Sequence, residues 1–275
     1  MENGNLIKKG VVVSVVLLFV SVSVIPSSGT NVVERKSTMP TLYDRNTLYV
    51  GGSGPNNYTK IQDAIDNASD GDTVFVYNGT YFEHLRIITD IDLFGEDIEK
   101  TVIDGGEEGT VVKIGAYVNL SGFKIRNSVE GITVLSLPPP NNIYKFNVSG
   151  NIIENCIIGI SLGGSQNHIV YKNIIKDNEL GINFFCADNC EVKNNNFINN
   201  EKHAYFEYVL FFQFLPRIKW NGNFWDDWDI RIPRPIKGLK VIMFIFRPGT
   251  GYKNPICPWI NFDWRPAREP YDIGV

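Results

Sequence analysis

Apolar and polar residues repeat through the middle of the chain with a period of 22 residues. Asn151, Asn173 and Asn195 each lie in a related string: VSGNIIEN, VYKNIIKD and VKNNNFIN. A second series, GITVLS, GISLGG, GINFFC and HAYFEY, keeps this period after one longer step of 28 residues. Its strings begin at Gly131, Gly159, Gly181 and His203. Two series that share one period indicate a repeat array.

Within each repeat, short β-branched runs alternate with polar residues and end at Asn or Gly. This alternation predicts strands, and the runs are too short for helices. A leucine-rich repeat needs several regularly placed Leu, whereas Ile and Val fill these positions. We therefore predict an all-β fold, a right-handed parallel β-helix of about seven coils of roughly 22 residues. Ile153, Ile175 and Phe197 should stack on one line inside it.

A repeat array needs capping units, because its end coils would otherwise expose the core. The apolar residues of the segment 58–69 follow the spacing of one helix face, which predicts a short N-terminal capping helix. Aromatic residues crowd the end of the chain, which predicts an aromatic-rich C-terminal cap over residues 229–275. Its apolar run, residues 239–246, should be a buried strand of this cap or else a partner-binding edge.

The N-terminus has the order of a secretory signal peptide. Lys8 and Lys9 precede the apolar run Val11–Ile25, and small residues follow it. We predict a signal peptide over residues 1–29 and a polar tether over 30–47; a retained anchor is the alternative. The β-helix domain is then expected over residues 48–228. The mature protein should be extracytoplasmic, secreted or held at the cell surface, with no stable membrane span after cleavage.

Composition narrows the range of partners. The 275 residues include 26 Lys and Arg against 30 Asp and Glu, a net charge of −4. Without clustered basic residues a nucleic-acid partner is not expected. Asn is abundant, with 15 of the 29 residues between Asn141 and Asn200. Asn tolerates the left-handed conformation of sharp corners, and equivalent Asn side chains stack one coil apart. Asn151, Asn173 and Asn195 are therefore predicted to form a structural ladder.

Acid–base chemistry on a β-helix needs carboxylates on neighbouring coils, and the repeats do not place two of them in stacked outward positions. Asp226, Asp227 and Asp229 do cluster, but between Trp225 and Trp228 they are expected to finish the last coil. No catalytic residue is assigned.

Metal chemistry has equally little support in the sequence. His84, His168 and His203 fall in unrelated phases of the repeat, and copper sites need close sets of Cys, Met or His. Neither a metal nor a cofactor is assigned. Cys186 and Cys190 form a near pair, which in an exported protein indicates a local disulfide or two buried thiols rather than a ligand pair.

All five tryptophans lie in the last 56 residues. Exposed indoles stack on sugar rings, so Trp220, Trp225 and Trp228 are candidate carbohydrate-binding residues. The alternative is that these bulky side chains plug the final coil.

The string IQDAIDNASDGDTVFVYNGTYFEHLRI, with DLFGEDIEKTVIDGG and VNLSGFKIRNS, resembles the opening coils of pectin-lyase-like β-helix proteins. The Asn-rich coils and NGNFWDDW resemble the NosD-like subfamily, which is common on microbial, especially archaeal, surfaces. The resemblance spans about residues 48–228. It implies the β-helix fold and, given the missing carboxylate set, a noncatalytic extracytoplasmic protein that binds glycan or another surface component. The alternative within the superfamily is a polysaccharide lyase or glycoside hydrolase. The NosD family is also associated with periplasmic copper handling.

Overall fold

The computed structural model describes residues 45–134, 145–164, 166–210, 217–242 and 256–274. The predicted signal peptide, nearly all of the predicted tether and the second half of the apolar run 239–246 lie outside these residues. Within the described part of the chain, no helix combines the length and apolar character needed to cross a bilayer.

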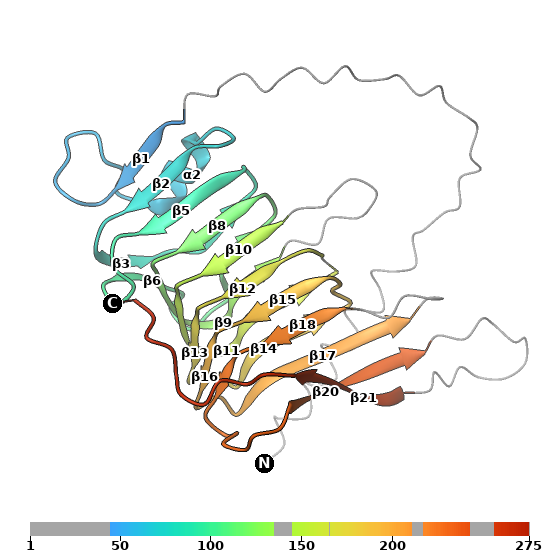
Figure 1. The fold of residues 1–275 in the computed structure, drawn as a ribbon. Coiled ribbons are helices and arrows are strands. Elements are labelled where there is room, and N and C mark those ends of the chain that lie inside the picture. The colour runs from blue at the N-terminus through green and yellow to red at the C-terminus, as the bar shows by residue number, and fades with distance from the viewer. Residues whose placement is uncertain (1–44, 135–144, 165, 211–216, 243–255, 275) are drawn as a thin grey trace, which may run out of the picture. The chain divides into compact units, whose positions relative to one another are not determined.

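The strands stack in three columns that form the sides of a parallel β-helix (Figure 1). The first column consists of β1 (Thr47–Val50), β2 (Thr73–Val76), β5 (Ile91–Gly95), β8 (Val118–Ser121), β10 (Phe146–Ser149), β12 (Ile169–Tyr171), β15 (Cys190–Lys193) and β18 (Ile218–Asn221). The second consists of β3 (Gly79–Phe82), β6 (Thr101–Asp104), the first part of β9 (Lys124–Val134), the first part of β11 (Ile152–Gly163), β13 (Ile174–Lys176), β16 (Asn196–Ile198) and β19 (Phe224–Trp225). The third consists of β4 (Leu85–Ile87), β7 (Thr110–Ile114), the second parts of β9 and β11, β14 (Leu180–Phe185), β17 (Lys202–Leu210) and β20 (Arg234–Ile242).

One strand from each column makes a coil, and the described strands make seven coils, from β2–β3–β4 to β18–β19–β20. The predicted right-handed parallel β-helix is therefore confirmed. Because β20 pairs in parallel with β17, it is the third side of the seventh coil. The coils thus continue beyond Trp228, where the sequence placed the start of the C-terminal cap. The last strand, β21 (Ile256–Asp263), runs antiparallel to β20 and closes that end.

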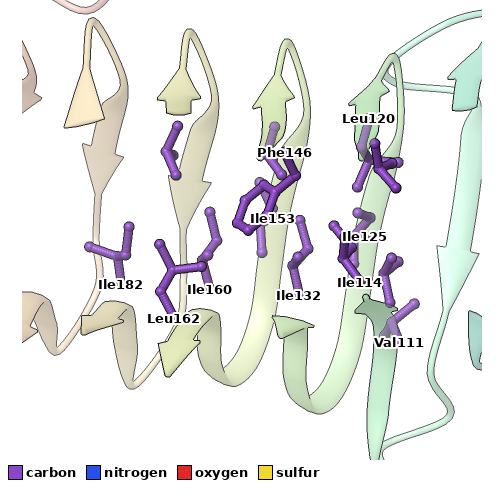
Figure 2. Close-up of a cluster of buried hydrophobic side chains, with 14 of the residues drawn as sticks. Val111, Ile114, Leu120, Ile125, Ile132, Phe146, Ile153, Ile160, Leu162 and Ile182 are labelled. Atoms are coloured by element: carbon purple, nitrogen blue, oxygen red, sulfur yellow. The ribbon is translucent and has the colours of Figure 1, made fainter. Parts of the chain in front are cut away.

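The interior is lined by residues in register from coil to coil. Ile125 pairs with Ile153, Ile153 with Ile175, and Ile175 with Phe197, and all four side chains are fully buried. The predicted interior line is thereby confirmed. Figure 2 shows Ile125 and Ile153 among the buried side chains of successive coils. Trp225 ends this line, with its ring stacked on Phe197 at a centroid distance of 4.2 Å.

The N-terminal cap is the helix α2 (Ile61–Asn67), which is shorter than the predicted segment 58–69. It packs against β1, β2 and β4, with Ile61, Ala64 and Ile65 buried. The carboxylate of Glu83 accepts hydrogen bonds from the first two backbone N–H groups of the helix, those of Ile61 and Gln62. The helix therefore begins where this acceptor satisfies its free donors.

An amide ladder runs through the core on one corner of the coils. Nδ2 of Asn151 donates to Oδ1 of Asn173 (3.2 Å), and Nδ2 of Asn173 donates to Oδ1 of Asn195 (3.0 Å). The ladder continues to Asn223 and ends at the buried carboxylate of Asp263, which accepts from Nδ2 of Asn223 (2.9 Å). Asp263 thus ends the ladder, because its carboxylate accepts the last N–H and has none of its own that would need a further acceptor.

Candidate functional site

A hollow of about 600 Å³ lies at the last coil. Its walls come from the turn between β16 and β17, from the segment after β19 and from the start of β20. An imidazole, two carboxylates and a guanidinium meet in this terminal-coil hollow, those of His203, Asp226, Asp227 and Arg234. Trp228 and three further charged residues, Glu201, Lys202 and Lys237, also line it. The fold therefore collects titratable groups at the end of the array.

His203 enters this hollow because it ends a column of glycines. A Cβ on Gly159 would lie 2.6 Å from the carbonyl oxygen of Gly181, and a Cβ on Gly181 would lie 2.5 Å from that of His203, so these positions exclude a side chain. The next coil leaves room at His203, because β17 pairs with β20 only from Phe206 onward. His203 is thus the first position in this column of glycines at which the next coil leaves room for a side chain.

His203 contacts both carboxylates of the hollow. Its Nε2 lies 2.8 Å from Oδ1 of Asp226 and 3.4 Å from Oδ1 of Asp227. The backbone N–H of Asn199 donates to the other oxygen of Asp226 at 2.6 Å. One imidazole nitrogen therefore faces two carboxylate oxygens, and one of these carboxylates is positioned by the backbone of the preceding coil.

Arg234 holds the second carboxylate. Its Nη2 donates to Oδ2 of Asp227 at 3.0 Å, and its Nη1 donates to Oδ1. The guanidinium carbon lies 4.4 Å from the ring centroid of Trp225, a cation–π distance. A two-pronged ion pair of this kind fixes the orientation of Asp227.

The second nitrogen of His203 faces a second amide ladder. Oδ1 of Asn178 accepts from the backbone N–H of Cys156, and Oδ1 of Asn200 accepts from both the backbone N–H (3.1 Å) and Nδ2 (3.0 Å) of Asn178. Nδ2 of Asn200 lies 2.9 Å from the carbonyl oxygen of Ile175 and 3.1 Å from Nδ1 of His203. His203 is thus the end of this ladder.

Burial is the main influence on the charge of His203. The side chain is 4% exposed, and desolvation lowers the pKa of His203 below its ordinary value. Asp227 and Asp226 act in the opposite direction, while Arg234 lowers the pKa further. The imidazole is accordingly neutral at pH 7.

Among the described residues, His203, Asp226 and Asp227 form a group of three whose ligand atoms lie within 4.8 Å of one another. Imidazole and carboxylate are ligands for divalent transition ions, whereas Cu(I) prefers Cys and Met. Arg234 already occupies both oxygens of Asp227 with a fixed positive charge. A ligating histidine normally donates its other ring N–H to an acceptor, but Nδ1 of His203 faces an amide donor. The set therefore fits a metal ion poorly.

A second hollow of about 380 Å³ lies next to the first, and Trp228 lines both. Trp264, 67% exposed, also lines this second hollow. Its charged lining consists of one carboxylate, Asp229, and three arginines: Arg231, Arg265 and Arg268.

The tryptophans predicted to bind carbohydrate divide into two groups. Trp220 and Trp225 are 2% and 1% exposed, because they fill the interior of the last coil, so they offer no face to a sugar. This corrects the expectation for these two residues and agrees with the plug alternative. Trp228 is only half-buried and borders both hollows. Trp259 and Trp264 are the exposed indoles of the described chain.

For the cysteines, the sequence left two forms open, a local disulfide or two buried thiols. Cys186 and Cys190 both carry thiols rather than a shared disulfide. Cys190 is the first residue of β15 and is buried, and desolvation raises the pKa of its thiol to about 11. Cys186 instead occupies a corner with a positive φ of 51°.

The sequence analysis did not assign His203 to a site, because the three histidines fall in unrelated phases of the repeat. It did not assign the aspartates either, because they were expected to finish the last coil. Asp226 and Asp227 instead lie between β19 and β20 within that coil, where they meet His203. One signal was present in the repeat itself: His203 is the departure from glycine in the series Gly131, Gly159 and Gly181. A side chain at a position otherwise reserved for glycine marks a place where the packing of the array opens.

Comparisons with known proteins place the chain in a family. Residues 65–209, just over half of the chain, match the family model described as periplasmic copper-binding protein (NosD). A search of curated proteins found no match. Among solved structures, a pectin methylesterase in complex with a hexasaccharide is 13% identical with a TM-score of 0.40, covering 64% of this chain and 78% of that chain. The pectin methylesterase PemA from Erwinia chrysanthemi is 12% identical with a TM-score of 0.37, covering 62% and 79%. On the extent of the family match, the chain belongs to the NosD family of pectin-lyase-like β-helix proteins.

Proposed function

We propose that this protein binds a glycan outside the cytoplasm, on the surface formed by the two hollows at the last coil. The observation that carries the proposal is the position of Trp228 in the wall of both hollows, between the one that contains Asp226 and Asp227 and the one that contains three arginines. Sugar rings offer apolar faces to indoles and hydroxyl groups to planar polar side chains. Both kinds of group are present here within one surface.

The arginines suggest the class of glycan. Within the described part of the chain, no carboxylate forms an ion pair with Arg231, Arg265 or Arg268. Guanidinium groups without a protein partner favour carboxylate or sulfate groups on a ligand. An acidic polysaccharide is therefore the favoured ligand.

Extracytoplasmic location rests on the family, whose model is described as periplasmic. The signal peptide over residues 1–29 remains part of the proposal. N-terminal sequencing of the exported protein distinguishes cleavage near Gly29 from a retained anchor. Recovery in the cytoplasm with Met1 intact would contradict both.

A second candidate function is polysaccharide cleavage, and it rests on the 2.8 Å contact between His203 and Asp226. A neutral imidazole beside two carboxylates has the group types used for proton transfer. Turnover of an acidic polysaccharide that is lost in Asp226→Asn would replace binding by catalysis as the function.

The test is a glycan array probed with the full exported protein, combined with reducing-sugar and unsaturated-product assays on acidic polysaccharides. Trp264→Ala should weaken binding about tenfold, as expected for the loss of one stacking face. Trp259→Ala is the matched control, because Trp259 is also exposed but lies in neither hollow. Equal losses in the two variants, or no binding at all, would refute this surface as the glycan site.

A further inference from the structure

The orientation of the Asn200 side chain is determined by the backbone around it. Its Oδ1 accepts from the backbone N–H of Asn178, a group that can only donate. Its Nδ2 donates to the carbonyl oxygen of Ile175, a group that can only accept. The amide therefore cannot be turned over without breaking both bonds. Its remaining N–H points at Nδ1 of His203, 3.1 Å away.

This geometry selects one tautomer of His203. Nδ1 has to accept, because the atom facing it is a donor, and in a neutral imidazole the proton then lies on Nε2. Nε2 faces the carboxylates of Asp226 and Asp227, which are acceptors. Both ring nitrogens are thus satisfied in this tautomer, and neither would be in the other.

We propose that this chain departs from the copper-binding description of its family at this site: the asparagine ladder holds His203 as a hydrogen-bond donor to Asp226 and Asp227, and the cluster takes ligand hydroxyl groups instead of a divalent cation. A metal ion at Nε2 needs the lone pair of that nitrogen, so the proton would move to Nδ1 and meet the Asn200 N–H. Nδ1 itself is already occupied by Asn200.

The charge of Arg234 also acts against a divalent cation, in opposition to the two carboxylates. Arg234 lies in the wall of the hollow and binds both oxygens of Asp227, so a divalent cation would approach a fixed positive charge. The cluster contains neither thiolate nor thioether. Asp226, which receives one N–H from His203 and one from Asn199, keeps oxygen lone pairs for the hydroxyl of a ligand. Asn200 is a positioning residue in this scheme.

The direct test is ¹⁵N NMR of the imidazole rings in the full protein. The chain has three histidines, so the spectrum contains few signals, and His203→Gln identifies those of His203. The expected pattern is a protonated Nε2 and an unprotonated Nδ1 near pH 7. A pattern with the proton on Nδ1 would overturn the proposal.

Asn200→Asp tests the role of the ladder. The new carboxylate offers an acceptor to Nδ1, so His203 should gain a proton there, visible in the same spectrum. Asn173→Asp is the matched control: it makes the same change in the other ladder, where Asn173 bonds to Asn195 and not to Asn200, and should leave the His203 pattern unchanged. An unchanged pattern in folded Asn200→Asp would refute the role of Asn200; should this variant not fold, the wild-type spectrum still decides the tautomer.

Metal exclusion is tested by titrating the wild-type protein and His203→Ala with Cu(II), followed by calorimetry. We expect the same number of bound ions in both proteins, since His203 holds none of them. Loss of one equivalent in His203→Ala would assign a copper site to this cluster and overturn the proposal. Glycan binding is measured separately, so its absence would leave this result unaffected.

Discussion

Among the residues that the structure describes, six of the ten non-glycine residues with a positive φ are asparagines, including Asn127, Asn155 and Asn199 at equivalent corners of the coils. None of the ladder residues Asn151, Asn173 or Asn195 belongs to this set. The sequence attributed both roles, corner and ladder, to the same asparagines, whereas the structure divides them. A corner needs a residue that tolerates the left-handed region, while a buried ladder needs an amide that both donates and accepts.

The burial of His168 makes the stability of the fold depend on pH. It is 1% exposed, its ring is stacked on Phe146, and within the described chain its Nε2 has no hydrogen-bond partner. Burial lowers the pKa of His168 to about 4. The unfolded chain therefore binds a proton below about pH 6.5 that the folded chain refuses until about pH 4.

We expect the free energy of unfolding to be highest above pH 6.5 and to fall by about 3 kcal/mol from this group as the pH drops toward 4. His168→Leu should remove that part of the pH dependence. Denaturant unfolding of both proteins at pH 7 and pH 4 measures it. Parallel losses of stability on acidification would contradict the assignment.

At the scale of the coil, spacing along the array is controlled by close backbone approach. The Cβ position of Gly181 is 2.5 Å from the carbonyl oxygen of His203, so the two strands can lie in register only with glycine there. Gly163, also in a strand, has no atom within 4 Å of its Cβ position. Both glycines lie in the third column of strands, but only Gly181 lacks room for a methyl group.

Gly181→Ala should lower the free energy of unfolding by about 2 kcal/mol, because the coils have to separate to admit the methyl group. Gly163→Ala should leave it unchanged or raise it by about 0.5 kcal/mol. Thermal unfolding followed by circular dichroism compares the two. Similar stability of both variants would mean that the array relaxes along its axis at little cost.

Across the whole molecule, the C-terminal segment ties the coils together. Residues 266–274, which we call the strap, run back along the stack (Figure 1). The backbone N–H of Ala267 donates to Asn223, Tyr271 exchanges two hydrogen bonds with the side chain of Asn196, and its hydroxyl donates to Gly222. Gly274 packs against Ile98. The strap therefore joins coils that are distant in sequence.

Deletion of residues 266–275 should lower stability by about 2–4 kcal/mol, the sum of a few hydrogen bonds. In hydrogen exchange, β16, β18 and β19 should lose protection, while β1 and β2, which the strap does not touch, should keep theirs. Glu269→Ala in the full chain is the control for a change in composition alone. Uniform loss of protection would show instead that the array unfolds as one unit.

The local pattern was sufficient for the architecture, because in a repeat array each coil contacts only its neighbours. The spacing of Ile153, Ile175 and Phe197 was enough to predict their stacking, and that of Asn151, Asn173 and Asn195 was enough to predict the ladder.

The 22-residue period does not say which side chains meet at the places where the period is broken. His203, Asp226 and Arg234 meet only because the start of β17, the segment after β19 and the start of β20 lie together, and Asp263 reaches Asn223 across 40 residues of chain. Whether Trp225 faces solvent or core was likewise decided by the final coil, which needs a large side chain to fill its open end. The sequence alone determined the repeating interior, and the tertiary structure decided the chemistry at its end, since a site of this kind depends on contacts that no local period encodes.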